Sequence, residues 1–282
     1  MELLSVIELD DAIERALAED VGHGDLTTRS TVPRGKRGRA KIIAKEPDII
    51  LAGGFIFERV FTMTGADPEI VRLAEEGARL RPRVVLAEYN GELAGLLTGE
   101  RVALNFVQLL SGIATLTNKF VEAVHGTNAR IVDTRKTHPG LRALEKYAVR
   151  AGGGHNHRFG LDSGILIKDN HIAAAGSISR AIDRARKLAP HTFLIEVECE
   201  TLAQVDEARS AGTDAILLDN MSLEDIRRAR KQVGSDIKLE VSGNVSLETV
   251  RPIAEAGVDL ISVGALTHSA RAMDLSMRIE SA

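Results

Sequence analysis

The chain has 282 residues, of which 44% are hydrophobic, 27% charged and 3% aromatic, and its formal net charge is −4. No apolar run approaches the ~20 residues that cross a bilayer, and the acidic stretch MELLSVIELDDAIERALAED is unlike a secretory signal or an Arg-rich transit peptide. The acidic balance and the absence of Trp argue against a nucleic-acid or membrane partner. A single cysteine, Cys199, excludes an intramolecular disulfide and suits a reducing compartment, so we expect a cytoplasmic protein.

The first part of the chain mixes helix and strand patterns. The predicted elements are a helix from Asp10 or Asp11, strands over 39–44 and 48–51, and a helix over 55–64. Asn90-Gly91 separates the apolar segments 83–88 and 93–97 and predicts a β-hairpin, because both residues tolerate the positive φ that such a turn needs. Residues 100–125 follow a helical pattern that Gly112 is expected to break into two helices. We therefore expect an N-terminal α+β domain that ends there.

From residue 129 onward, strand and helix patterns alternate. The predicted strands cover 130–134, 164–169, 193–199, 215–220, 238–243 and 260–265, and the helices between them begin at Ser177, Thr201, Ser222 and Ser246, hydroxyl residues suited to cap a helix. The last four strands recur about every 22 residues, the spacing of a β/α barrel. The Gly-rich stretch 152–160 is a candidate for a seventh strand. The predicted fold class is therefore α/β, with a β/α barrel that follows the first domain.

Charged residues stand where these strands end, which is where barrel enzymes carry their chemistry. Arg135, Lys136, Arg158 and Lys168, with His157 beside them, are expected to converge on one bowl. Arginine offers a fork that matches carboxylate or phosphate, and lysine a compact charge. The alternative, a solvated face of surface charges, suits the outer helices better than the strand ends. The sequence therefore predicts an enzyme for a strongly anionic, phosphorylated substrate.

Two carboxylates occupy equivalent places in successive units, Glu198 and Asp219. Facing one bowl, they would bind a divalent cation, stabilise developing positive charge, or pair with the lysines. Mg²⁺ typically takes one or two carboxylates together with phosphate oxygens, which fits this arrangement. The alternative, that both only neutralise Lys136 and Lys168, does not exclude catalysis.

The last two strands end in Ser242-Gly243-Asn244 and Gly264-Ala265. Barrels often bind phosphate at these places through backbone N–H groups. Glycine also serves any tight turn, but the occurrence of both sequences in the last two units favours phosphate. Other residues are given structural roles: Cys199 as a buried thiol, and the basic stretch 34–41, which has no interleaved aromatics, as a solvated strand face. The histidines lack zinc-site spacing.

Three motifs are the most specific in the chain: DTRKTHPG at 133–140, GGGHNHR at 152–158 and ILIKDNH at 165–171. Shorter blocks lie at 20–28, 101–105, 111–115, 196–198 and 263–268. In these blocks, over essentially its whole length, the chain resembles the quinolinate phosphoribosyltransferase family. The resemblance implies transfer of the phosphoribosyl group of phosphoribosyl pyrophosphate to quinolinate with decarboxylation, which gives nicotinate mononucleotide, CO₂ and pyrophosphate for NAD biosynthesis. One departure is Gly243-Asn244, where the family often has two glycines; Asn tolerates positive φ.

The resemblance also implies residue roles and an architecture. The residues implied to hold quinolinate are Arg101, Thr134, Arg135, His157, Arg158 and Lys168. The implied catalytic residues are Lys136 and Lys168, which face pyrophosphate, and Glu198 and Asp219, which accompany the ribose and, directly or indirectly, Mg²⁺. The residues implied to bind the 5′-phosphate are Ser242, Gly243, Asn244, Gly264, Ala265 and His268. The implied fold is an incomplete, seven-stranded β/α barrel over 112–268 and an N-terminal sandwich domain over 1–111, joined by the C-terminal tail 269–282. Arg101 reaches the neighbouring chain's site, which implies a homodimer or a dimer-based assembly such as a hexamer.

Three alternatives remain open. A related phosphoribosyltransferase-like protein accompanies molybdate transport genes. A Schiff-base aldolase would use Lys168, and borohydride trapping with a carbonyl substrate would reveal it. A non-catalytic phosphate-binding barrel would leave Arg135 and Glu198 without a purpose.

Overall fold

The computed structural model describes residues 5–281, which form two compact units. Unit 1 contains the chain up to Asn118, residues 137–153, and the chain from Leu266 onward; unit 2 contains residues 119–136 and 154–265. Residues 137–153, which lie within the predicted barrel domain, thus group with unit 1. Within 5–281, no helix combines the length and the apolar character needed to cross a membrane.

Unit 1 is built on an antiparallel sheet with the strand order β12-β1-β5-β3. Its strands are β1 (Arg37–Ala44), β3 (Glu69–Leu73), β5 (Val85–Glu92) and β12 (Leu275–Ser281), and a separate pair is formed by β2 (Ile49–Ile50) and β4 (Arg79–Leu80). The C-terminal strand β12 pairs with β1, with Leu275 opposite Ala44. Alternate residues of β1 are buried, as expected of a sheet with one covered face.

Unit 1 also contains helices, one of which packs an aromatic side chain against this sheet. They are α1 (Val6–Val21), α2 (Leu26–Thr31), α3 (Phe55–Met63), α5 (Arg142–Ala151) and the greater part of α4 (Leu93–Ala123). Phe61 of α3 meets Tyr89 of β5 edge to face, with ring centroids 5.4 Å apart. Both side chains are fully buried. The predicted helix over 55–64 is confirmed, and the first helix begins at Val6 rather than at Asp10 or Asp11.

Two predictions for this unit are wrong. Asn90 and Gly91 form no hairpin but lie inside β5, which leads directly into α4. Gly91 is small because a Cβ would lie 2.8 Å from the backbone oxygen of Ala66. The helix α4 also runs through Gly112 without a break. A Cβ at Gly112 would overlap the backbone oxygen of Arg271, so this glycine admits the C-terminal segment rather than ending a helix.

Unit 2 contains a curved parallel sheet of six strands in the order β6-β11-β10-β9-β8-β7. These strands are β6 (Arg130–Val132), β7 (Ile165–Ile167), β8 (Ile195–Cys199), β9 (Ala215–Asp219), β10 (Lys238–Ser242) and β11 (Leu260–Ser262). Each predicted strand is present, with shorter ends. A parallel bridge joins Val132 of β6 to His155, within the predicted seventh strand. The sheet is thus a β/α barrel left incomplete between His155 and β7.

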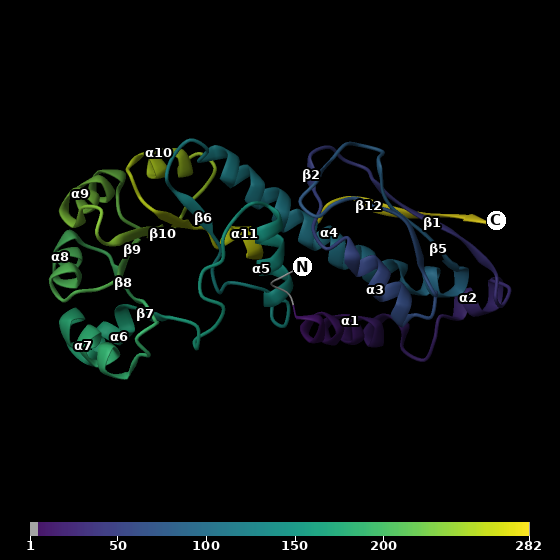
Figure 1. Ribbon diagram of the computed structural model, residues 1–282, viewed down its shortest axis with the longest axis horizontal. Coiled ribbons are helices and arrows are strands. Elements are labelled where there is room, and N and C mark those ends of the chain that lie inside the picture. Colours follow the sequence, from purple (N-terminus) through teal and green to yellow (C-terminus); the bar gives the residue numbers. More distant parts are fainter. Residues whose placement is uncertain (1–4, 282) are drawn as a thin grey trace. The chain divides into compact units, whose positions relative to one another are not determined.

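Helices lie around the outside of this sheet (Figure 1). They are α6 (Asp169–Ala175), α7 (Ile178–Leu188), α8 (Leu202–Ser210), α9 (Leu223–Val233) and α10 (Val250–Glu255). The short helix α11 (Ala265–His268) follows β11 and belongs to unit 1 from Leu266 onward. Ser177, Thr201 and Ser222 accept backbone N–H bonds as the predicted N-caps. The fourth predicted start is wrong: Ser246 opens a turn, and the helix begins at Val250.

Candidate active site at the strand ends of unit 2

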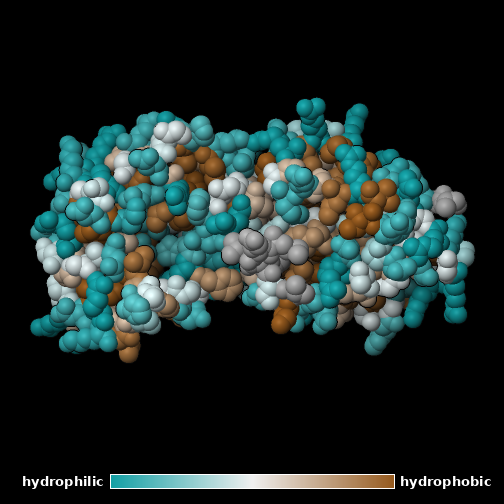
Figure 2. Space-filling model, in the orientation of Figure 1, coloured by the Kyte–Doolittle hydropathy of each residue, from teal (hydrophilic) through white to brown (hydrophobic). Residues whose placement is uncertain are grey.

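The predicted site residues of unit 2 follow the carboxyl ends of its parallel strands. Thr134, Arg135 and Lys136 follow β6, Lys168 follows β7, Glu198 lies near the end of β8, Asp219 and Ser242 end β9 and β10, and Gly264 follows β11. Because the strands are parallel, these ends meet at one edge of the sheet. Figure 2 shows a hollow with a hydrophilic lining inside the curve of the strands.

Two guanidinium groups are held near one another at this edge. Burial and the positive charge of Arg135 lower the pKa of Arg158, while the Glu196 carboxylate acts in the opposite direction. Arg158 Nη1 donates to the backbone oxygen of Gly164 at 3.0 Å, which fixes the direction of the side chain. Two neighbouring cations repel one another unless an anion lies between them. The two guanidinium groups are therefore suited to bind an anionic group at this edge.

Lys168 and Glu198 form an ion pair. The Lys168 side chain is 44% exposed and the Glu198 side chain 11%. Pairing with a lysine was one of the roles left open for Glu198. The exposed ammonium can exchange this carboxylate for a ligand phosphate, so the pairing agrees with a site for a charged substrate.

Asp133 fixes the loop that carries His157 and Arg158. Its fully buried carboxylate accepts a hydrogen bond from Asn156 Nδ2 at 2.5 Å and another from the backbone N–H of His157 at 2.9 Å. The backbone N–H of His155 donates to Ile131 O, and the backbone N–H of Asp133 donates to His155 O, so His155 pairs with the end of β6. The GGGHNHR motif is thereby held against the first strand of the sheet.

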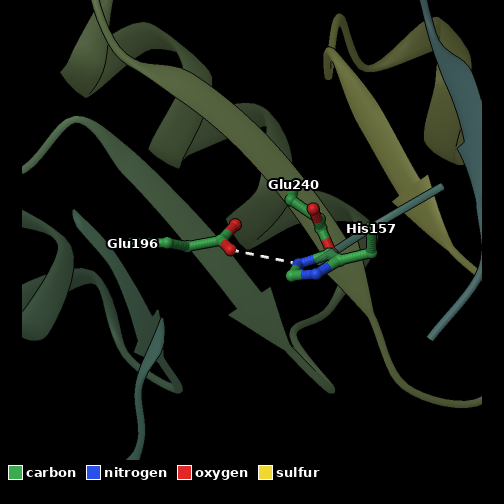
Figure 3. Close-up of side chains that lie close together, drawn as sticks. All are labelled: His157, Glu196 and Glu240. Atoms are coloured by element: carbon green, nitrogen blue, oxygen red, sulfur yellow. Dashed lines mark hydrogen bonds and ion pairs between the residues drawn. The ribbon is translucent and has the colours of Figure 1, made fainter. Parts of the chain in front are cut away.

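His157 points toward two carboxylates inside the barrel, Glu196 of β8 and Glu240 of β10 (Figure 3). His157 Nε2 lies 3.2 Å from Glu196 and 3.7 Å from Glu240. His157 Nδ1 accepts the backbone N–H of Arg158 at 2.7 Å, so the ring proton belongs on Nε2, facing the carboxylates. Burial and the neighbouring Glu196 carboxylate raise the pKa of Glu240 to about 7.

The ligand atoms of these three residues lie within 4.8 Å of one another, a spacing that also suits a metal ion. A metal-bound histidine usually donates from its second ring nitrogen. Here that nitrogen, Nδ1, accepts a backbone N–H. The arrangement therefore suits a proton shared among these three side chains better than a metal ion. The two glutamates orient His157.

A second group of polar contacts joins the ends of β9 and β10. Asn220 Nδ2 donates to Asp219 Oδ2 at 2.9 Å, and Asn244 Nδ2 donates to Asn220 Oδ1 at 3.1 Å. Asn220 and Asn244 both have positive φ, 53° and 49°. The left-handed backbone predicted as tolerable for Asn244 is thus present, and the Ser242–Asn244 loop turns back against the end of β9.

The remaining predicted residues have simpler surroundings. Thr134 Oγ1 accepts the backbone N–H of Lys136 at 3.0 Å. Arg101 is exposed on α4, and His268 Nδ1 lies 2.7 Å from Ser269 Oγ at the end of α11. These last two residues belong to unit 1. Cys199 is buried, and burial raises the pKa of its thiol to about 12, as expected of a structural thiol.

The sequence interpretation gave no role to Asp133, Glu196, Asn220 and Glu240. A signal for the glutamates was present, since Glu196 precedes Glu198 by two positions and Glu240 precedes Ser242 by two. Residues two apart lie on one face of a strand. An acidic residue on an otherwise apolar strand, on the same face as a site residue, therefore pointed into the barrel.

A β/α barrel with cations, carboxylates and a glycine-containing turn at its strand ends defines an enzyme for phosphorylated, anionic substrates. The family model of the quinolinate phosphoribosyl transferase N-terminal domain matches residues 25–111, and that of the C-terminal domain matches residues 113–278. The chain belongs to the quinolinate phosphoribosyl transferase family.

Individual relatives match this chain over nearly its whole length, and the identities below are those of the chain. It is 45% identical over 274 residues to the probable nicotinate-nucleotide pyrophosphorylase [carboxylating] of Bacillus subtilis, covering 97% of this chain and 94% of that protein. It is 44% identical over 285 residues to the nicotinate-nucleotide pyrophosphorylase [carboxylating] of Mycobacterium leprae, covering 98% and 99%. The crystal structure of NadC from Streptococcus pyogenes superposes with a TM-score of 0.95 at 43% identity, covering 99% of each chain.

Proposed function

We propose that this protein transfers the phosphoribosyl group of phosphoribosyl pyrophosphate to quinolinate, with decarboxylation, to give nicotinate mononucleotide, CO₂ and pyrophosphate for NAD biosynthesis. The observation that carries the proposal is the pair Arg135 and Arg158 at the same barrel edge as the Ser242–Asn244 loop. A dicarboxylate and a phosphorylated sugar need these two kinds of site side by side.

Quinolinate binding is assigned to the cationic strand ends. The guanidinium groups of Arg135 and Arg158 match its two carboxylates, and Lys168 adds a third charge. Thr134 completes the site from the loop after β6. His157 directs its Nε2–H group toward Glu196, so we assign the His157 ring to shaping the quinolinate pocket.

The phosphoribosyl group is assigned to the opposite strand ends. The backbone N–H groups of Ser242, Gly243 and Asn244, together with Gly264 and Ala265, suit the 5′-phosphate. Lys136 and Lys168 take the pyrophosphate. Lys168 would then leave Glu198 and turn toward a phosphate oxygen.

The reaction follows from placing these groups together. The pyridine nitrogen attacks the anomeric carbon while the bond to pyrophosphate breaks, and the positive charge that develops on the sugar is stabilised by Glu198 and Asp219. The alkylated ring nitrogen is positively charged, so it can hold the electron pair left on the adjacent carbon when CO₂ departs. A proton from water then completes the product. The protein's part is mainly to position and neutralise.

Glu198 and Asp219 fit Mg²⁺, because both are carboxylates at the ends of the neighbouring strands β8 and β9. We assign them to this ion, directly or through water. When bound, Mg²⁺ supplies positive charge to the pyrophosphate oxygens.

The decisive experiment mixes the protein with quinolinate, phosphoribosyl pyrophosphate and Mg²⁺ and measures nicotinate mononucleotide by chromatography. Formation of the product is expected, and its absence would reject the function. Nicotinic acid is the matched substrate, because it lacks one carboxylate and leaves a cation of the site unpaired, so it should react poorly. Comparable turnover of both acids would reject the assignment of Arg135 and Arg158.

The proposed assembly is a dimer in which Arg101 completes the partner's site. Arg101→Ala and Lys136→Ala proteins should each be nearly inactive. Unfolded together and reassembled, they should form mixed dimers in which one site carries both defects and the other carries neither. Random pairing makes about half of the dimers mixed, each with one good site of two, so activity should return to about a quarter of wild type. No recovery, with mixed dimers confirmed by mass spectrometry, would place Arg101 in its own chain's site or outside it.

A further inference from the structure

Asn220 stands between a proposed catalytic carboxylate and the proposed phosphate loop. It directly follows β9, whose last residue is Asp219. Its backbone has a φ of 53°, and its backbone N–H donates to Ser242 O at 3.0 Å. This bond continues the pairing of β9 with β10 by one residue and places the Asn220 side chain beside the loop 242–244.

The two ends of the Asn220 amide have different partners. Its Nδ2 donates to Asp219 Oδ2, and its Oδ1 accepts from Asn244 Nδ2. The amide cannot be reversed, because an ionised carboxylate only accepts hydrogen bonds and would face the amide oxygen. Asp219 therefore fixes the direction of the amide, and the amide presents an acceptor to Asn244.

Gly243 shows how closely the loop packs on this amide. Its φ is 94°, and a Cβ at this position would lie 2.6 Å from Asn220 Cγ and overlap Oδ1. The glycine is therefore required by the position of Asn220 as well as by its own backbone. Ser242, Gly243 and Asn244 each touch Asn220, by a backbone bond, by packing and by a side-chain bond respectively.

We propose that Asn220 is a positioning residue that couples Asp219 to the Ser242–Asn244 loop, so that the 5′-phosphate and the reacting end of the sugar are held at a fixed separation. This inference rests on the site assignment made under the proposed function. Asn244 supplies the side-chain contact from the loop to this amide.

The test measures the binding of ribose 5-phosphate by isothermal titration calorimetry. Mg²⁺ is left out, so that the affinity depends on the Ser242–Asn244 loop. Asn220→Gly and Asn244→Gly both keep a residue that accepts positive φ and remove only the amide. Each should weaken ribose 5-phosphate binding about three- to tenfold, the size of one net hydrogen bond. Quinolinate binding should stay within about twofold, a split that a general loss of folding would not produce.

The double variant separates coupling from independent effects. If Asn244 acts through Asn220, Asn220→Gly/Asn244→Gly should bind ribose 5-phosphate as Asn220→Gly does. In steady-state assays Asn220→Gly should also lower kcat, because Asp219 loses its donor, whereas Asn244→Gly should chiefly raise the KM for phosphoribosyl pyrophosphate. Additive losses in the double variant would overturn the proposal.

Asp48→Gly is the matched control, since Asp48 also has a positive φ, 59°, and lies in unit 1. It should leave all constants unchanged. Gly243→Val tests the underlying assignment: if it binds ribose 5-phosphate as wild type does, the loop is not the phosphate site and the proposed assignment fails. If Gly243→Val abolishes binding while Asn220→Gly and Asn244→Gly do not change it, only the role of Asn220 fails.

Discussion

The two halves of the barrel edge solve the binding of anions in different ways. The ends of β6 and β7 carry charged side chains, with Arg135 and Lys136 after one strand and Lys168 after the other. The ends of β9, β10 and β11 carry no Lys or Arg within residues 219–222, 242–246 and 263–265. They offer backbone groups in tight turns instead, held by the asparagines Asn220 and Asn244.

This difference indicates how one barrel sorts two anionic substrates. A guanidinium fork matches a planar carboxylate, whereas a turn of backbone N–H groups surrounds a tetrahedral phosphate. The ends of β6 and β7, the cationic half, should therefore decide affinity for quinolinate. The ends of β9, β10 and β11, the backbone half, should decide affinity for the sugar phosphate. Glu198 and Asp219, on the adjacent strands β8 and β9, lie where the halves meet.

The largest effect is expected at that junction. Glu198→Gln and Asp219→Asn keep side-chain volume but remove the negative charge that stabilises the transition state, so kcat should fall about 100-fold or more. The melting temperature should change little, because neither carboxylate is fully buried. Glu200→Gln, at an exposed position just after β8, is the matched control and should keep its activity within about twofold. Near-normal turnover of both amide variants would reduce Glu198 and Asp219 to local counter-charges.

A smaller and more selective effect is expected in the cationic half. Arg158→Lys keeps a positive charge but loses the fork and the bond to Gly164 O. The KM for quinolinate should rise about tenfold or more, while the KM for phosphoribosyl pyrophosphate stays within about twofold. Arg228→Lys, on the exposed outer helix α9, is the control. Equal rises for both substrates would contradict the division of the site into two halves.

The backbone half is tested by Gly243→Ala. The added Cβ meets the Asn220 amide, so the KM for phosphoribosyl pyrophosphate should rise about tenfold while quinolinate binding is retained. Gly212→Ala is a matched control, because Gly212 also has a positive φ, 74°, but no atom lies within 4 Å of its added Cβ. Both variants should lose about 1 kcal/mol of stability from backbone strain, and Gly243→Ala should lose more because its Cβ would overlap Asn220 Oδ1. A similar rise in KM for Gly212→Ala would attribute the effect to strain alone.

The sequence predicted the barrel well because its signals are local. Apolar runs marked the six strands, and Ser177, Thr201 and Ser222 marked helix starts that the structure confirms. The failures in unit 1 come from contacts between distant residues. Gly91 is required by the close approach of Ala66, and Gly112 by the close approach of Arg271. Neither of these distant residues is part of the local sequence pattern.

The site divides in the same way. The rule that strand ends carry function was enough to single out Lys168 and Glu198, which form an ion pair. It could not find Asp133, whose hydrogen bonds go to residues more than 20 positions away, or the interior pair of Glu196 and Glu240. Such partners depend on which strands become neighbours across the barrel, and this follows from the whole fold.

The last prediction concerns that interior pair, which lies below both halves of the edge and affects stability instead of substrate binding. The Glu240 side chain is 1% exposed, and burial together with Glu196 raises its pKa from 4.5 to about 7. A carboxyl group whose pKa is raised by folding stabilises the protein fully below pH 4.5, and this contribution is lost as the pH rises through about 7. Glu240→Gln mimics the protonated form and does not titrate. It should therefore match wild type in melting temperature at pH 5 and exceed it at pH 8, by the equivalent of about 1–3 kcal/mol.

Glu224→Gln, on the exposed side of α9, is the control and should show no such dependence on pH. The sign of the difference is what decides, because a carboxylate that stabilises the fold by binding His157 would make Glu240→Gln less stable at pH 8. That outcome would mean that His157 carries a positive charge and belongs with Arg135 and Arg158 as a cation of the quinolinate half. The expected outcome agrees with the geometry of His157, whose Nδ1 accepts the backbone N–H of Arg158 and whose Nε2 faces Glu196. The recognition of quinolinate's carboxylates then rests on the arginines and Lys168.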